Sequence, residues 1–228
     1  MITMRSPQVA RSVFAATYDL PDWRIVSRTL QAEFRAKSLA SAAAFAQQVV
    51  DAADAADHHP DIALRASGRI RIVLSSHDAN GLSARDASLA ATVSGLARTA
   101  GLAAEPLVVQ RLEVAIDVMN IAAVMPFWKA VLAYVEEPPQ DSQWPSDALI
   151  DPLGVGQPLW FQQMDTPRPD RNRIHLDVLV PEDVALARVD AALAAGGTLL
   201  TDQYARSFWV LADPEGNEIC VCTWQDRD

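Results

Sequence analysis

The charged side chains of this 228-residue chain fall into two unlike halves. Residues 1–104 hold 11 lysines and arginines against 9 aspartates and glutamates, a net charge of +2, whereas residues 105–228 hold 8 against 20, a net charge of −12. Such a break in charge indicates two separately composed parts, and the length suffices for two domains of ordinary size. We therefore expect one domain over residues 1–104 and a second over residues 105–228.

The composition is that of a folded globular protein, because 50% of the residues are hydrophobic and 21% are charged. No apolar run is long enough to span a bilayer and residues 1–20 lack the pattern of a signal peptide, so we expect no membrane association. Two cysteines, Cys220 and Cys222, cannot build a disulfide framework, which favours a reducing, cytoplasmic location. The net charge of −10 argues against nucleic acid as a partner.

Hydrophobic periodicity predicts three strands and two amphipathic helices in the first half. The strands are expected at residues 23–26, 30–34 and 69–74, and the helices at residues 39–56 and 84–98. Ser38 is a suitable N-cap for the first helix, and Pro60 disfavours helical geometry at His59. Residues 1–20 show no clear periodicity, and residues 102–109, which include Pro106, are expected to form a linker.

The second half contains two strand–helix segments, each followed by further strands. Strands are expected at residues 109–116, 148–150, 159–164, 174–180, 208–211 and 218–223, and helices at residues 122–134 and 182–195. This order suggests an internal duplication, in which Asp117 of the first copy corresponds to Asp183 of the second.

Three of the four histidines, His58, His59 and His77, lie close together in the first half. Imidazole titrates near neutral pH and can donate or accept a proton, which suits general acid–base catalysis. His58 and His59 end a predicted helix and His77 follows a predicted strand, so these element ends can converge on one pocket. Adjacent residues of an extended segment point in opposite directions, so we expect different roles for His58 and His59.

Two other interpretations of the histidines remain open. Imidazoles at a helix C-terminus interact favourably with the helix dipole, which gives His58 and His59 a purely structural role. Three histidines together with Asp54 or Asp61 could also bind zinc, although their spacing matches no short metal motif.

The segment that contains these histidines resembles the signature of the pterin-4a-carbinolamine dehydratase family, and the resemblance extends from Trp23 to Leu96. The signature has an acidic residue, three positions, His-His-Pro, a later single His and, after eight positions, an Asp. The matching residues are Asp54, His58, His59, Pro60, His77 and Asp86. The resemblance implies an α+β domain, an antiparallel sheet with helices on one face, that works without a cofactor and assembles as a homo-oligomer.

The resemblance also implies a reaction, the dehydration of a 4a-hydroxytetrahydropterin to a quinonoid dihydropterin. Such a hydro-lyase acts on a small-molecule pterin, and it needs an acid for the leaving hydroxyl and a base for the neighbouring ring nitrogen. The resemblance suggests His58 and His77 as the acid–base pair and His59 as a binding or orienting group. Substrate contacts are expected from Asp54, Asp61 and Asp78.

Two residues of this segment leave alternatives open. Asp86 is explained as well by capping the second helix as by catalysis. Ser67 stands ten positions before His77, where the family usually has an aromatic residue that could pack in the pocket. The alternative function is therefore a non-catalytic protein that retains the pterin pocket as a sensor or assembly surface.

Three segments of the second half, taken in order, resemble the glyoxalase-like branch of the vicinal oxygen chelate superfamily, and this resemblance extends from Val109 to Trp224. The segments are Phe127-Trp128, His175-Leu176-Asp177 and Asp213-Pro214-Glu215-Gly216-Asn217. The resemblance implies a pair of βαβββ modules. In many members, inward-facing strand residues hold a divalent metal.

The positions that match this metal set are only partly suited to a metal. They are Gln110, Gln162 or Gln163, His175 and Cys220, with Glu218 as a substitute. Amides bind metals weakly, so we expect no metal; if one is present, we expect His175, Glu218 and Gln110 to hold it. A metal-dependent lyase or dioxygenase-like activity in this half is the third functional hypothesis.

Overall fold

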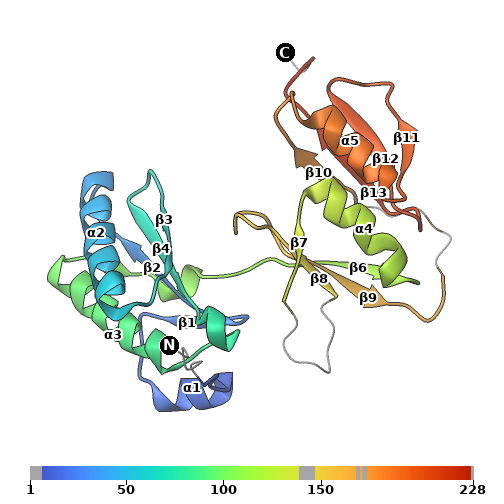
Figure 1. Ribbon diagram of the computed structural model, residues 1–228. Coiled ribbons are helices and arrows are strands. Elements are labelled where there is room, and N and C mark those ends of the chain that lie inside the picture. Colours follow the sequence, from blue (N-terminus) through green and yellow to red (C-terminus); the bar gives the residue numbers. More distant parts are fainter. Residues whose placement is uncertain (1–6, 139–146, 168–169, 171–173, 227–228) are drawn as a thin grey trace. The chain divides into compact units, whose positions relative to one another are not determined.

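The computed structural model describes residues 7–138, 147–167, 170 and 174–226, and the chain divides into two compact units, Met1–Arg111 and Leu112–Asp228 (Figure 1). Each unit has a hydrophobic core of its own. Among the described residues, no helix combines the length and the hydropathy that crossing a membrane requires.

The first unit contains an antiparallel sheet, in the order β1-β2-β4-β3 with β5 beside β2, and the helices α2 and α3 pack on one of its faces. Its elements are α1 (Arg11–Thr17), β1 (Arg24–Val26), β2 (Thr29–Arg35), α2 (Leu39–Ala56), β3 (Asp61–Leu64), β4 (Arg69–Leu74), η1 (His77–Ala79), α3 (Ala84–Thr99), β5 (Ala103–Ala104) and η2 (Pro106–Val108). Alternate residues of β4 and one stripe of α2 form the core, as the periodicity predicts. The unit is therefore of the expected α+β class.

Three features of this unit differ from the expectations. The segment before residue 20 contains α1. Phe14 is the one buried residue of this helix, so the sequence shows no hydrophobic periodicity that would predict it. The edge strand β3 has mostly exposed side chains and lacks the alternation of a half-buried strand. The expected linker at residues 102–109 contributes β5 and η2, and Glu105 pairs with Arg35 and Arg69 on the sheet.

The second unit consists of two modules with the same topology (Figure 1). The first contains β6 (Val114–Val118), α4 (Ile121–Leu132), β7 (Val135–Glu136), β8 (Ala148–Ile150) and β9 (Leu159–Gln163), and the second contains β10 (Leu176–Leu179), α5 (Ala185–Ala194), β11 (Thr198–Thr201), β12 (Phe208–Ala212) and β13 (Glu218–Cys222). In each module the first strand pairs in parallel with the last, and the other pairs are antiparallel. Side chains from α4, α5 and both sheets share one core. These are paired βαβββ modules.

The strand registers match the two modules residue by residue. Leu159 and Ile219 occupy equivalent positions in the last strands of the two modules. Leu159 pairs with Leu149 and Ile219 pairs with Leu211, and each of these leucines lies two residues before an Asp-Pro turn. On their other side, Leu159 and Ile219 each pair with the first strand of their module. Asp117 therefore corresponds to Leu179 and not, as expected, to Asp183. The reason for the difference is that the connection from strand to helix is longer in the second module.

Gly197, which follows α5, marks a close approach between the two modules. A Cβ atom added there would overlap two ring carbons of Phe127 on α4, whose side chain is completely buried. We expect Gly197→Ala to lower the free energy of unfolding of the second unit by about 1–3 kcal/mol, because the ring cannot yield without repacking. Differential scanning calorimetry measures this change.

Gly95→Ala is the matched control, because an added Cβ in α3 would meet only the end of Arg98, at 3.9 Å. We expect this change to stabilise the first unit by about 0.5–1 kcal/mol through helix propensity. A Gly197→Ala protein with the stability of the wild type would contradict the packing described for Phe127.

Candidate functional site

The end of α2 sets the directions of His58 and His59. Asp57 has the left-handed conformation (φ 47°), and the N–H groups of Asp57 and His58 donate to the carbonyls of Asp54 and Ala53 at 3.2 and 3.1 Å. This pair of hydrogen bonds is the Schellman arrangement, which ends a helix and reverses the chain. His58 is consequently buried, with 5% of its surface exposed, whereas His59 lies on the surface.

Asp86 joins His58 to two serines inside the unit. Its carboxylate, in the first turn of α3, is completely buried and accepts hydrogen bonds from His58 Nε2 (2.8 Å), Ser76 Oγ (2.8 Å) and the backbone N–H of Ser83 (2.7 Å). Ser83 Oγ lies 3.2 Å from the same carboxylate and accepts from the N–H of Arg85 as the N-cap of α3. Asp86 therefore caps the helix and also orients a histidine.

The bond to Asp86 leaves the other nitrogen of His58 available. An ionised carboxylate only accepts hydrogen bonds, so opposite an ionised Asp86 it is Nε2 of His58 that donates. Within the ranges that the structure describes, the only buried side-chain nitrogen or oxygen without a partner is Nε of Arg85. Nδ1 of His58, for which no hydrogen bond is seen among the described residues, is therefore in contact with solvent.

The other two histidines are exposed. His59 Nε2 lies 3.1 Å from Asp54 Oδ1, and both side chains are more than half exposed. His77 begins η1, on a loop that backbone hydrogen bonds between Ser76 and Gly81 close. Asp78, the next residue, forms an ion pair with Arg85 at the start of α3, which fixes the loop that contains His77.

The hairpin of β3 and β4 brings the three histidines to one edge of the sheet. Asp61, the first residue of β3, pairs with Val73 near the end of β4, so the chain before β3 and the chain after β4 meet at the same end of the hairpin. The bonds of His58 and Ser76 to one carboxylate confirm this proximity. Successive residues of a strand point to opposite faces of the sheet. Because Ile62 packs against the core beneath the helices, its neighbour Asp61 points to the opposite face of the sheet.

Ser67 lies in the turn at the far end of this hairpin. The turn is closed by hydrogen bonds between Arg65, Gly68 and Arg69, and four paired residues, roughly 13 Å of strand, separate it from the edge with the histidines. Ser67, which stands where the sequence comparison above expects an aromatic residue, is therefore remote from His58 and His77 within this unit.

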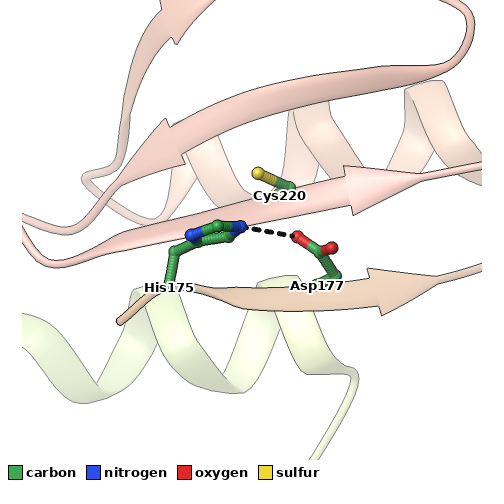
Figure 2. A group of neighbouring side chains, drawn as sticks. All are labelled: His175, Asp177 and Cys220. Atoms are coloured by element: carbon green, nitrogen blue, oxygen red, sulfur yellow. Dashed lines mark ion pairs between the residues drawn. The ribbon is translucent and has the colours of Figure 1, made fainter. Parts of the chain in front are cut away.

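A second group of chemically active side chains lies on one sheet face of the second unit. Figure 2 shows His175, just before β10, with Asp177 on β10 and Cys220 on the neighbouring strand β13. His175 Nε2 and Asp177 Oδ1 are 3.5 Å apart, and one nitrogen, oxygen or sulfur of each of the three residues lies within 4.8 Å of the others. Burial, and next the charge of Asp177, raise the pKa of the Cys220 thiol to about 12.

The residues expected to hold a metal are placed differently. His175 and Glu218 both line a cavity of 670 Å³ between β6, β10 and the turn before β13, but Glu218 is not part of the cluster with Cys220. Gln110 precedes β6 and belongs to the first compact unit. Gln163 donates to the carbonyls of Met119 and Met164. Sequence reasoning missed Asp177, which stands directly opposite Cys220 in the strand register.

Comparisons with known proteins divide the chain in the same way. Residues 6–96 match the family model described as pterin 4 alpha carbinolamine dehydratase, and residues 113–222 match the model described as glyoxalase-like domain. A protein of Cyanothece, described as "Putative pterin-4-alpha-carbinolamine dehydratase", is 40% identical over 79 residues, which are 35% of this chain and 80% of the relative. One with the same description from Nocardia farcinica is 42% identical over 90 residues, 38% of this chain and 90% of the relative.

Solved structures also resemble part of the chain. A glyoxalase/bleomycin resistance protein/dioxygenase family enzyme from Burkholderia phytofirmans is 20% identical, with a TM-score of 0.40, over 49% of this chain and 95% of that structure.

These findings identify the kind of protein in two parts. The first unit is an α+β domain with three histidines at one edge of an antiparallel sheet, and the second is a pair of βαβββ modules. The chain belongs to the pterin-4a-carbinolamine dehydratase family through its N-terminal part, to which a glyoxalase-like domain is fused.

The burial of Asp86 gives a prediction about stability. We expect Asp86→Ala to lower the free energy of unfolding of the first unit by about 2–4 kcal/mol, because His58, Ser76 and Ser83 lose a buried hydrogen-bond acceptor. Chemical denaturation followed by circular dichroism measures the loss.

Asp54→Ala is the matched control, since it removes the carboxylate of the exposed pair with His59. We expect it to cost less than about 1 kcal/mol, as is usual for exposed ion pairs. Equal effects of the two substitutions would show that the buried network around Asp86 does not stabilise the unit.

Proposed function

We propose that the first unit is a 4a-hydroxytetrahydropterin dehydratase, a hydro-lyase that forms quinonoid dihydropterin by histidine acid–base catalysis. The observation that carries this proposal is the buried bond from His58 to Asp86, a carboxylate that also binds Ser76, the residue directly before His77. Membership of the pterin-4a-carbinolamine dehydratase family supports the substrate class.

The proposed reaction needs two proton transfers and no change of oxidation state. The bond between C4a and the hydroxyl oxygen breaks, and the oxygen leaves with the electron pair and with a proton from the acid. A base removes the proton of the neighbouring ring nitrogen, and the electron pair of that N–H bond forms the new double bond to C4a. Imidazole suits both steps because its ordinary pKa lies near neutrality.

We infer that His58 and His77 form the acid–base pair. In this proposal the carboxylate of Asp86 holds the His58 ring in one orientation and one tautomer, so that Nδ1 is the nitrogen available for proton transfer. His77 lies on a closed loop at the same edge. The histidine that is protonated when the substrate binds acts as the acid, and the other acts as the base.

We further infer that His59 binds and orients the pterin, with Asp54 fixing its imidazole at 3.1 Å. Asp61 and Asp78 remain part of the proposed substrate-binding set. Family membership also supports, as parts of the same proposal, a homo-oligomeric state and a cytoplasmic location.

The test is an assay of the full chain with freshly generated 4a-hydroxytetrahydropterin, in which absorbance follows the quinonoid product. We expect the wild-type protein to accelerate dehydration, and His58→Ala and His77→Ala each to lower kcat/KM at least about 100-fold, the usual minimum for losing a general acid or base. His175→Ala, which removes the fourth histidine, is the matched control and should retain full activity.

Two outcomes would overturn the proposal. If the folded protein binds a pterin without accelerating the reaction, the non-catalytic alternative holds. If His175→Ala abolishes turnover while His58→Ala does not, the chemistry belongs to the second unit.

A further inference from the structure

We propose that the N-terminal segment Gln8–Val9 is a positioning element of the dehydratase site, which holds the His77 loop (residues 76–82) in place relative to His58. The inference rests on the proposed function, because it concerns the geometry of the acid–base pair. Both residues of the segment precede the signature that contains the histidines. The basis of the inference is a set of contacts between this segment and the last residues of the loop, Asn80–Leu82.

The His77 loop is closed by backbone hydrogen bonds of its own. The N–H of Ser76 donates to the carbonyl of Gly81 at 2.8 Å, and the N–H of Gly81 donates to the carbonyl of Ser76 at 3.3 Å. The N–H of Asn80 donates to the carbonyl of His77 at 3.2 Å. These bonds couple Asn80 and Gly81 to His77, so a constraint on either residue also limits the movement of His77.

Contacts with α3 support the first part of the loop. Ser76 donates to the carboxylate of Asp86, and Asp78 forms its ion pair with Arg85. Both contacts precede residues 80–82 in the sequence. The last part of the loop therefore depends on support from elsewhere in the chain.

The N-terminal segment supplies support at this end of the loop. The backbone N–H of Val9 donates to the carbonyl of Leu82 at 2.8 Å, and the side-chain amide of Gln8 donates to the carbonyl of Asn80 at 3.4 Å. The bond from Val9 has the ordinary length of a backbone hydrogen bond, whereas the bond from Gln8 is long. We therefore assign the larger part of the hold to the backbone of Val9.

Gly81 shows how closely the segment lies against the loop. A Cβ atom added to Gly81 would lie 2.7 Å from Nε2 of Gln8, and 3.4 and 3.5 Å from its Cδ and Cγ atoms. The backbone of Gly81 is outside the left-handed region, so the space that Gln8 occupies is what disfavours a side chain here. The side chain of Gln8 is flexible, so an alanine at this position would displace it and leave the loop folded.

The segment is itself anchored outside the loop. Val9 packs against the hydrophobic core, and Phe14 in the following helix α1 is buried there with 2% of its surface exposed. Arg11 donates to the carbonyl of Ser27 at 3.1 Å. These contacts fix the segment independently of the His77 loop, so it can serve as a support for the loop.

The position of His77 matters because the acid and the base must reach two atoms of one substrate. His58 is held by Asp86, so the distance between the two histidines changes when the His77 loop moves. A misplacement of about 1 Å can lower a rate roughly 100-fold. Because His59 and Asp61 lie outside the loop, we expect the loss of the hold to lower kcat and to leave KM unchanged.

The kinetic test compares Val9→Pro with Val9→Ala in the full chain. Proline lacks the N–H that binds Leu82, whereas alanine keeps it. We expect Val9→Pro to lower kcat for 4a-hydroxytetrahydropterin about tenfold, with KM within about twofold of the wild-type value. Val9→Ala is the matched control and should keep kcat. Circular dichroism verifies that both variants fold.

A double-mutant cycle tests the contact between Gln8 and Gly81. We expect Gly81→Ala, which displaces the side chain of Gln8, and Gln8→Ala each to lower kcat. Because both substitutions break the same contact, the double variant should be no slower than the slower single variant.

Hydrogen exchange measures the hold without any pterin. We expect the amide protons of Asn80 and Gly81, followed by nuclear magnetic resonance, to exchange roughly 2- to 10-fold faster in Val9→Pro than in the wild-type protein. This range corresponds to the loss of about one net hydrogen bond. In Val9→Ala the two protons should exchange at the wild-type rate.

Several results would overturn the proposal. They are unchanged exchange in Val9→Pro, faster exchange without a fall in kcat, a rise in KM in place of that fall, equal effects of Val9→Pro and Val9→Ala, and additive effects in the cycle. If the wild-type protein does not accelerate dehydration, the proposed function fails. Faster exchange in Val9→Pro would still support the hold of the segment on the loop.

Discussion

The carboxylate of Asp86 ties together three segments that are distant in sequence: the end of α2, the end of β4 and the start of α3. A buried carboxylate is stable only when hydrogen-bond donors replace the water that it has lost. His58, Ser76 and Ser83 supply these donors, and each is held in place by doing so. The orientation of His58, and with it the geometry of the proposed acid–base pair, follows from this one requirement.

The two units use carboxylate–imidazole pairs in different surroundings. His58 and Asp86 are buried, so their geometry is fixed by packing and their separation would leave uncompensated polar groups. His175 and Asp177 are exposed on a sheet face, where water competes for both groups, so this pair contributes little to stability. Only the buried pair has the fixed geometry that a positioned proton carrier requires.

Much of the fold could be predicted because several elements combine strong periodicity with clear end signals. The helix α2 begins at Leu39 behind Ser38, and β4 alternates buried and half-buried residues along its whole length. The strands β3 and β7 and the helix α1 could not be predicted, because they are short and bury few side chains. Their formation depends on neighbours that the local sequence does not reveal.

The sequence by itself determined the two-part organisation, the α+β class, the family of the first unit and the histidines from which a site could be built. The spacing around His58, His59 and His77 is a property of the chain and needs no coordinates. Only the tertiary structure decided which histidine is buried against Asp86 and that Asp177 faces Cys220. The physical reason is that hydrogen-bond partners 28 residues apart, and strand partners 43 residues apart, meet only after the chain has folded and the register is set.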